Sequence, residues 1–323
     1  MNRAVHLFLS AAVALALAVV AATATEWPAK PVRVIVPVAA GGAADFIGRV
    51  FAASLAATLG QPFVVENRVG AGGLTGTESV ARSEPDGYTL MVSGMSFHVL
   101  APALSRNPGF HPVRDFTHIA YFGGTPMILV AHPSLGIKSF QELSALADGR
   151  NGAIDYVSPG TGTVGNIVAE VLANDAKLKL QHVPYKGGGA AILDLVAGHV
   201  KVGCMTLSTT LEHIRAGGLV PIAVSSPHRV SDLPQVPTFA ELGYPDLVLT
   251  SWFALSGPAN LPEAIVEPLN HAVNDSMTKD DVRSKLQKEA VLTKPMTPDE
   301  FTRFVESEVN KWTPVVNALM VTK

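Results

Sequence analysis

A strand, a glycine turn and a helix follow one another between Val32 and Gly60, and this unit constrains the fold more than any other stretch. Its opening letters, VRVIVPV, form a nearly unbroken β-branched run, typical of a strand buried on both faces of a parallel sheet. Ala40-Gly41-Gly42-Ala43 then turns the chain. From Asp45 onward apolar residues recur on one helical face, and Gly60 favours a helix end. Ligands of open α/β sheets bind beyond such strand ends, where unpaired helix amides favour anions.

The first 24 residues have the features of a secretory signal peptide. Arg3 precedes an apolar run from Leu7 to Ala22, and Ala22-Thr23-Ala24 matches a small-residue cleavage site. We expect cleavage after Ala24. An uncleaved membrane anchor is the alternative, but the run is short for a membrane-spanning helix.

Composition limits the classes of protein that remain. A formal charge of −3 argues against a surface for nucleic acid or anionic membrane. The 323 residues, 48% of them hydrophobic, suggest about two domains after removal of the signal peptide. The single cysteine, Cys204, excludes an internal disulfide and is expected to be an inert core thiol in an apolar strand.

A β-α rhythm stops and restarts along the chain. The first hundred residues read β-α-β-α-β, which is typical of a doubly wound parallel sheet. Strands are expected at Phe116–Phe122 and at Met127–Ala131, and the β-α rhythm then begins again. A second crossing strand is expected at Val248–Leu255, followed by helices, the last of which starts at a capping box, Thr297-Pro298-Asp299-Glu300. We therefore predict two α/β lobes, 25–126 with 254–323 and 127–253, joined by two crossing strands.

The motifs favour binding over catalysis. Residues 160–165 read G-x-G-x-x-G between a strand and a helix, but a dinucleotide site also needs an acidic residue about 20 positions on, and Lys177–Gly189 contains none. No cofactor is therefore expected. No G-x-S-x-G elbow and no metal-ligand spacing of histidines is present, so no metal site is predicted. Asp45 is explained by helix capping.

The chain resembles the solute receptors of tripartite tricarboxylate transporters, the Bug family. The matching segments run in order through the region after the signal peptide: Trp27-Pro28, Lys30–Pro37, Ala40-Gly41-Gly42 with Asp45, Gly60-Gln61-Pro62, Val65–Arg68, Gly70–Gly73, Pro85–Leu90, His182–Gly187, Leu233-Pro234, Val236-Pro237-Thr238 and Thr297-Pro298 with Glu300-Phe301. The resemblance implies a two-lobed periplasmic binding protein fold (type II-like) that closes on a carboxylate. Such receptors hold the carboxylate with backbone amides, hydroxyls and water rather than with an arginine.

Site residues are carried over from the resemblance by position. The first-lobe loop is Ala40, Gly41, Gly42, Ala43 and Asp45, and the second-lobe loop is Ser158, Gly160, Thr161 and Thr163. The predicted substrate-binding set also includes Ser93, Ser96, Asn166, Tyr185 and Met205. We expect the amides of Gly41, Gly42, Ala43 and Thr161, with the Thr163 hydroxyl, to take the carboxylate. Asp45 is expected to orient loop amides or water, because two bare carboxylates repel.

Departures from the family pattern affect the ligand. Val38-Ala39 replaces Phe-Pro, Asn166 stands where a histidine is frequent, and Met205 stands where an aspartate is frequent. A wider, less polar pocket suggests an aromatic or otherwise apolar carboxylate.

The sequence therefore predicts an exported, periplasmic, monomeric receptor without catalytic residues, serving the membrane subunits of a tripartite transporter or a sensor. A secreted enzyme using Asp45 or Ser93 in the same cleft is the alternative. A receptor-like protein that has lost its ligand is a further one.

Overall fold

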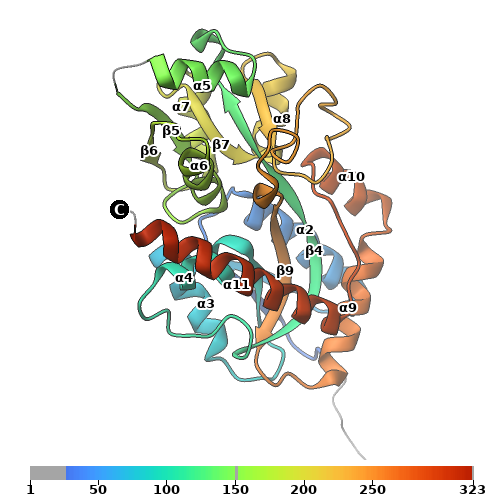
Figure 1. The fold of residues 1–323 in the computed structure, drawn as a ribbon. Helices are drawn as coiled ribbons and strands as arrows, with labels where there is room; N and C mark the ends of the chain where they lie inside the picture. The colour runs from blue at the N-terminus through green and yellow to red at the C-terminus, as the bar shows by residue number, and fades with distance from the viewer. Residues whose placement is uncertain (1–26, 150–151, 322–323) are drawn as a thin grey trace, which may run out of the picture.

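The computed structural model describes residues 27–149 and 152–321 of the chain. Two α/β halves lie one above the other, and two strands, β4 (Phe116–Ala131) and β9 (Thr250–Pro258), run from one to the other (Figure 1). The described part of the chain contains no helix that is both long and apolar enough to cross a membrane. The predicted cleavage site after Ala24 lies outside the described residues.

The first half is built on the strand and glycine turn that open the chain. β1 (Val32–Val36) pairs in parallel with β2 (Phe63–Asn67) and with β3 (Thr89–Gly94). Between them run α2 (Ala43–Leu59), the 3-10 turn η1 (Ala71–Gly73) and α3 (Leu74–Ala81). The β-branched side chains of β1 that point into the sheet's two faces are buried, as the unbroken apolar run predicted.

The second half repeats the β-α rhythm. β5 (Ile154–Ser158) pairs in parallel with β6 (Leu180–Pro184) and β7 (Val202–Thr206). The helices are α5 (Phe140–Gly149), α6 (Val164–Asp175), α7 (Gly188–Val196) and α8 (Leu207–Arg215), and β8 (Val220–Val224) completes the sheet. Each of α6, α7 and α8 starts at the carboxyl end of the strand before it, so their amino ends point toward the first half.

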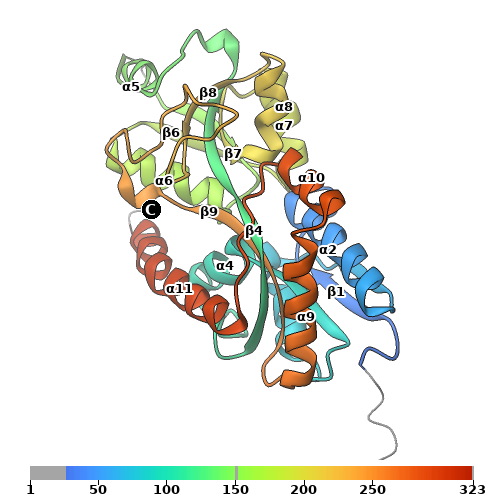
Figure 2. The same cartoon turned by 90° about the vertical axis from the view of Figure 1, so that its right-hand side faces the viewer.

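The expected break between Phe116–Phe122 and Met127–Ala131 is absent, because β4 is one strand of 16 residues (Figure 2). Its first part pairs antiparallel with β9 as far as Pro126, and its last part pairs with β7 and β8. The hydrogen-bonded strand order is therefore continuous through β4. Pro126 suggested an interruption, but it stands at the end of the β4–β9 register, where a missing N–H interrupts little.

The helices at the end of the chain pack mainly against elements of the first half and against β4. α9 (Glu263–Ser276) packs against α2 and β4, and α10 (Asp280–Lys288) packs against α2. α11 (Pro298–Val321) packs on β4, on the π-helix η2 (Met95–Leu100) and on α4 (Ala101–Leu104). The capping box forms: the Glu300 N–H donates to Thr297 Oγ1 at 3.2 Å, and the Thr297 N–H donates to Glu300 Oε2 at 2.9 Å.

Candidate functional site

A cavity of about 1440 Å³ lies between the two halves. Its walls are mainly the turns that follow strands: residues 37–44 after β1, 69–74 after β2, 159–165 after β5, 185–190 after β6, and Thr206, Ser208 and Thr209 at the end of β7 and the start of α8. Ser96 and Phe97, just after β3, also line it from the first half. The cavity therefore occupies the place where an open α/β sheet receives its ligand.

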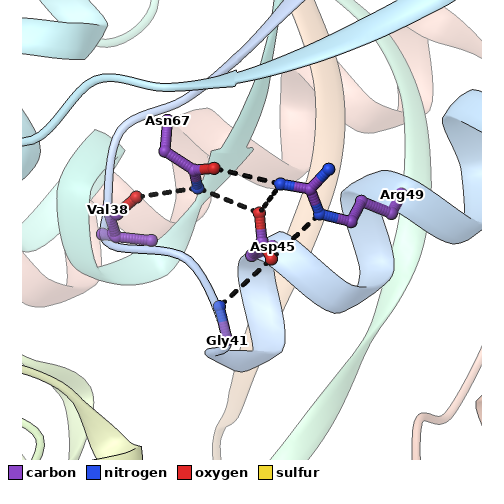
Figure 3. A network of polar contacts seen from close by, with 5 residues as sticks. All are labelled: Val38, Gly41, Asp45, Arg49 and Asn67. Atoms are coloured by element: carbon purple, nitrogen blue, oxygen red, sulfur yellow. Dashed lines mark hydrogen bonds and ion pairs between the residues drawn. The ribbon is translucent and has the colours of Figure 1, made fainter.

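Asp45 braces the β1–α2 turn through a network of hydrogen bonds (Figure 3), and it does not line the cavity. Its Oδ2 accepts the Gly41 N–H at 3.1 Å, and its Oδ1 accepts Asn67 Nδ2 at 2.9 Å and Arg49 Nη2 at 2.9 Å. Asn67 also donates to the Val38 carbonyl at 3.1 Å. Burial by itself would raise the pKa of Asp45, but the hydrogen bonds from Arg49, Asn67 and Gly41 outweigh it and lower the pKa. Asp45 therefore braces the loop through its hydrogen bond with the Gly41 N–H, with its pKa held below the usual value.

The amino end of α2 opens into the cavity. Its N-cap is Gly42, which has no side chain to bond the first amides of the helix. Gly42, Ala43 and Ala44 all line the cavity. The helix dipole adds to these amides, so this end of the cavity favours an anion.

The α6 turn is braced by side chains behind it. Ser158 Oγ donates to the Gly160 carbonyl at 3.1 Å and accepts the Gly160 N–H at 3.2 Å. Asn166 Oδ1 accepts the Gly162 N–H at 2.9 Å, and Asn166 Nδ2 donates to the Tyr156 hydroxyl at 2.8 Å. Thr163 caps α6: its Oγ1 accepts the Asn166 N–H at 3.5 Å and donates to the Gly160 carbonyl at 2.7 Å. Thr161, between these braced residues, lines the cavity.

These bonds correct two of the expected ligand donors. The Gly41 N–H is taken by Asp45, and the single hydroxyl proton of Thr163 goes to the Gly160 carbonyl. The amides that remain for an anion are those of Gly42, Ala43 and Thr161, because each lines the cavity and none is bonded by the bracing side chains.

The G-x-G-x-x-G spacing has a structural explanation without a dinucleotide. Gly160 and Gly162 have φ values of +151° and +76°, which L side chains rarely adopt. A Cβ at Gly165 would lie 2.3 Å from the carbonyl oxygen of Cys204 on β7. The third glycine therefore lets the start of α6 pack directly on the strand beside it, the role such a glycine has in other strand–turn–helix units.

The structure brings most of the predicted site residues together and leaves some outside. Those that line the cavity are Ala40, Gly41, Gly42, Ala43, Ser96, Gly160, Thr161, Thr163 and Tyr185. Those that do not line it are Asp45, Ser93, Ser158, Asn166 and Met205. Ser93 is buried, and its Oγ lies 2.8 Å from Ser256 Oγ. Met205 is buried within β7. Ligand contact by the lining residues remains a prediction.

Other lining residues were missed by the sequence reasoning. The Gly70–Gly73 turn was noticed as a glycine cluster, and its position after β2 could have placed it in the cavity. Three aromatic side chains also line it, Phe46, Phe97 and Phe253, but each lies in an apolar pattern that reads as core. Of the described residues that line the cavity, only Lys186 and Glu289 carry a charge. Glu289 comes from the end of α10, and no local motif marks it.

Thr163 provides a test of the capping role. We expect Thr163→Val to lower the free energy of unfolding by about 1–2 kcal/mol, because it removes an N-cap and a hydrogen bond. Thr163→Ser should keep most of that stability. Urea denaturation of the two variants measures the difference. Normal stability of Thr163→Val combined with lost carboxylate binding would instead make the hydroxyl a ligand donor.

Comparison with known proteins gives consistent results. Residues 47–321 match the model of the tripartite tricarboxylate transporter family receptor. Protein BugT of Bordetella pertussis is 35% identical over 296 residues, 91% of this chain and 90% of BugT. The structure of the periplasmic binding protein BugD superposes with a TM-score of 0.83 at 30% identity, covering 91% of this chain and 99% of BugD. The R. palustris protein Rpa4515, solved with adipate, gives a TM-score of 0.84 at 30% identity, covering 91% of this chain and 98% of that one.

Proposed function

The chain belongs to the tripartite tricarboxylate transporter receptor family, and on that premise we propose that it holds a small organic carboxylate between its two halves and releases it unchanged. Membership makes it a solute-binding receptor for small carboxylates rather than an enzyme. What remains to be proposed is how this chain holds the acid, where it works and with which partners.

One observation carries the proposal for the site. The amino ends of α2 and α6 come from opposite halves and open into the same cavity. A carboxylate between them can accept N–H groups of Gly42 and Ala43 from the first half and of Thr161 from the second. Such amides and helix dipoles bind an anion without a cationic side chain. Closure of the halves brings both sets of donors to one ligand.

The cations near the cavity do not replace these amides. Arg49 is engaged by Asp45 and also donates to Asn67 Oδ1 at 3.1 Å, and it does not line the cavity. Lys186 lines the cavity from the β6–α7 turn but is exposed to solvent, where a charge pair contributes little.

Location and partners follow from the family. The signal peptide is proposed to be cleaved after Ala24, so that the receptor works in the periplasm, like the binding protein BugD. It is proposed to act as a monomer that delivers its ligand to the membrane subunits of a tripartite transporter or to a sensor. The proposed lobes are residues 25–126 with 254–323 and 127–253, with β4 and β9 as the crossing strands.

The two candidate catalytic groups of the alternative, a secreted enzyme, are not placed to act on a ligand in the cavity. Asp45 accepts hydrogen bonds from three residues, Gly41, Arg49 and Asn67, and Ser93 is buried against Ser256. Neither lines the cavity. The test is isothermal titration of the protein with aliphatic, hydroxy and aromatic acids, followed by chromatography of the released ligand. Stoichiometric heat with the acid recovered unchanged supports the receptor; a converted acid, or no heat with any acid, contradicts it.

The proposal that no cationic side chain holds the carboxylate can be tested separately. We expect Lys186→Met to weaken the binding of the best acid by less than about fivefold, because an exposed ammonium contributes at most about 1 kcal/mol. The same titration measures it. A loss of a hundredfold or more would show that the carboxylate is held by Lys186 rather than by the helix amides.

A further inference from the structure

Glu289 places a negative charge on the cavity wall without a counter-charge. It is the C-cap residue of α10 and lines the cavity. Within the described part of the chain its carboxylate has no hydrogen-bond or ion-pair partner. Among the described lining residues the one opposite charge is Lys186, on the β6–α7 turn.

The position of Glu289 is fixed by the segment that follows it. Ala290 has a φ of +49° and is buried in the core of the second half, against residues of β4 and α8. Leu292 then bonds Gly124 of β4 in both directions, at 3.0 Å and 2.8 Å. A segment from the end of the chain is thus tied to both halves where β4 crosses between them. The backbone at Glu289 is therefore held next to the cavity by the segment that follows it.

The surroundings of Glu289 are unfavourable for a further negative charge. Burial, and after it the nearby Glu212 carboxylate on α8, raise the pKa of Glu289. Glu212 is itself paired with Arg215, at 2.6 Å, so that arginine is already engaged. A ligand carboxylate that approaches this wall meets the Glu289 carboxylate, which is paired with no cation among the described residues.

Much of the remaining wall is apolar. Phe46, Phe97 and Phe253 line the cavity from the first half and the crossing strand, and Leu104 and Ile192 line it from either side. Such side chains suit a hydrocarbon or aromatic body, whose burial is favourable, and offer nothing to a second carboxylate.

We propose that Glu289 makes this cavity select acids with one carboxylate and an apolar body, and discriminate against dicarboxylates such as adipate. The inference rests on the proposed function: the single carboxylate occupies the amides of α2 and α6, and the apolar body lies toward the aromatic walls. A second carboxylate has to be desolvated near a fixed negative charge, which lowers its affinity by about tenfold or more.

The experiment compares acids that differ only in the second carboxylate. Hexanoate with adipate, and benzoate with terephthalate, are titrated into the protein and into Glu289→Gln at pH 7.5. The protein is expected to bind each monocarboxylate at least about tenfold more tightly than its partner, and Glu289→Gln is expected to reduce that ratio about tenfold. Glu263→Gln, which removes the same charge from the exposed start of α9 outside the cavity, should keep the ratio. Melting curves establish that each variant is folded.

The outcomes separate the inference from the proposed function. Adipate and terephthalate binding as tightly as their monocarboxylate partners, or a ratio that Glu289→Gln leaves unchanged, overturns the selection by Glu289 while the receptor function stands. Failure of every acid to bind overturns the receptor function and this inference with it.

Discussion

Replacing Gly42 by valine is expected to abolish carboxylate binding while leaving the protein folded. Gly42 has a φ of −92° and a ψ of 174°, a conformation that any residue adopts, and a Cβ there would meet no atom within 4 Å. A Cβ is therefore accommodated there without a clash, and the two methyl groups of valine are expected to block a ligand's approach to the first amides of α2. If two hydrogen bonds to a charged group are lost, each about 1.5–3 kcal/mol, affinity falls by at least about a hundredfold.

Titration calorimetry measures the loss of binding, and thermal melting shows whether the variant is folded. The melting temperature should fall only slightly, because valine is a poorer N-cap than glycine by about 1 kcal/mol. Gly149→Val is the matched control: Gly149 also has open space around it, and it lies at the end of α5 outside the cavity. The control should bind normally. Normal binding by Gly42→Val would place the carboxylate elsewhere.

Gly165→Val is expected to differ from Gly42→Val, because it should also destabilise the fold. Its Cβ would collide with the backbone oxygen of Cys204, so any loss of binding there accompanies a loss of stability. The two glycines lie in similar strand–turn–helix units, and the structure separates their roles: Gly42 leaves room for a ligand, and Gly165 leaves room for the neighbouring strand.

Local sequence was sufficient for the parts of the fold that depend on local chemistry. The β-branched run of β1 and the glycine turn of α2 predicted a buried parallel strand and an open helix end, and both formed. The capping box at Thr297 predicted the start of α11 to within a residue. In each case the signal and the structure that it specifies lie within a few residues of each other.

The orientation of polar side chains at strand ends was less predictable. Ser93 and Met205 lie in strands buried on both faces, so no alternation of polar and apolar residues shows which side chains reach the cavity. Asn166 follows the glycine turn and looked like a ligand contact, yet it turns inward to hold Gly162 and Tyr156. The turn needs such a brace because its own amides would otherwise have no acceptor.

The contributions from distant parts of the chain were invisible for a different reason. Glu289 reaches the cavity because Leu292 pairs with Gly124, a contact between residues far apart in sequence. A Cβ at Gly123 would lie 2.7 Å from the Leu292 carbonyl oxygen, so glycine is required in β4 for this segment to approach. The sequence of neither segment alone predicts that the two segments come into contact.

Two buried histidines in the first half lead to the second large prediction. His98 on η2 and His118 on β4 have ring centroids 5.6 Å apart, among Phe110, Phe116 and Phe301. His98 Nε2 bonds the Pro112 carbonyl at 2.8 Å, and within the described residues His98 Nδ1 and His118 Nε2 have no partner. Both rings are therefore placed to be neutral.

The pKa values of the two histidines predict how the stability of the fold changes with pH. Burial, and after it the neighbouring His118, lower the pKa of His98 to about 3, and burial lowers the pKa of His118 to about 4. In the unfolded chain each imidazole takes up a proton as the pH falls through about 6.5, while the folded protein does not. The unfolded state then binds more protons, so stability is present above pH 6.5 and is lost as the pH falls toward 4. The expected slope is about 1.4 kcal/mol per pH unit for each histidine.

Urea denaturation between pH 7.5 and 4.5 measures this slope. Glu289 and Glu308 have raised pKa values, so their protonation stabilises the fold as the pH falls and opposes part of the histidine effect. Single variants isolate the histidines: His98→Phe and His118→Phe keep an aromatic ring in the cluster, and each should reduce the slope by about 1.4 kcal/mol per pH unit. His228→Phe, which removes an exposed imidazole, is the control. Each buried variant also loses polar contacts, so the test compares the slope of stability against pH and not the absolute stability. An unchanged slope would mean that the buried rings take up protons without unfolding.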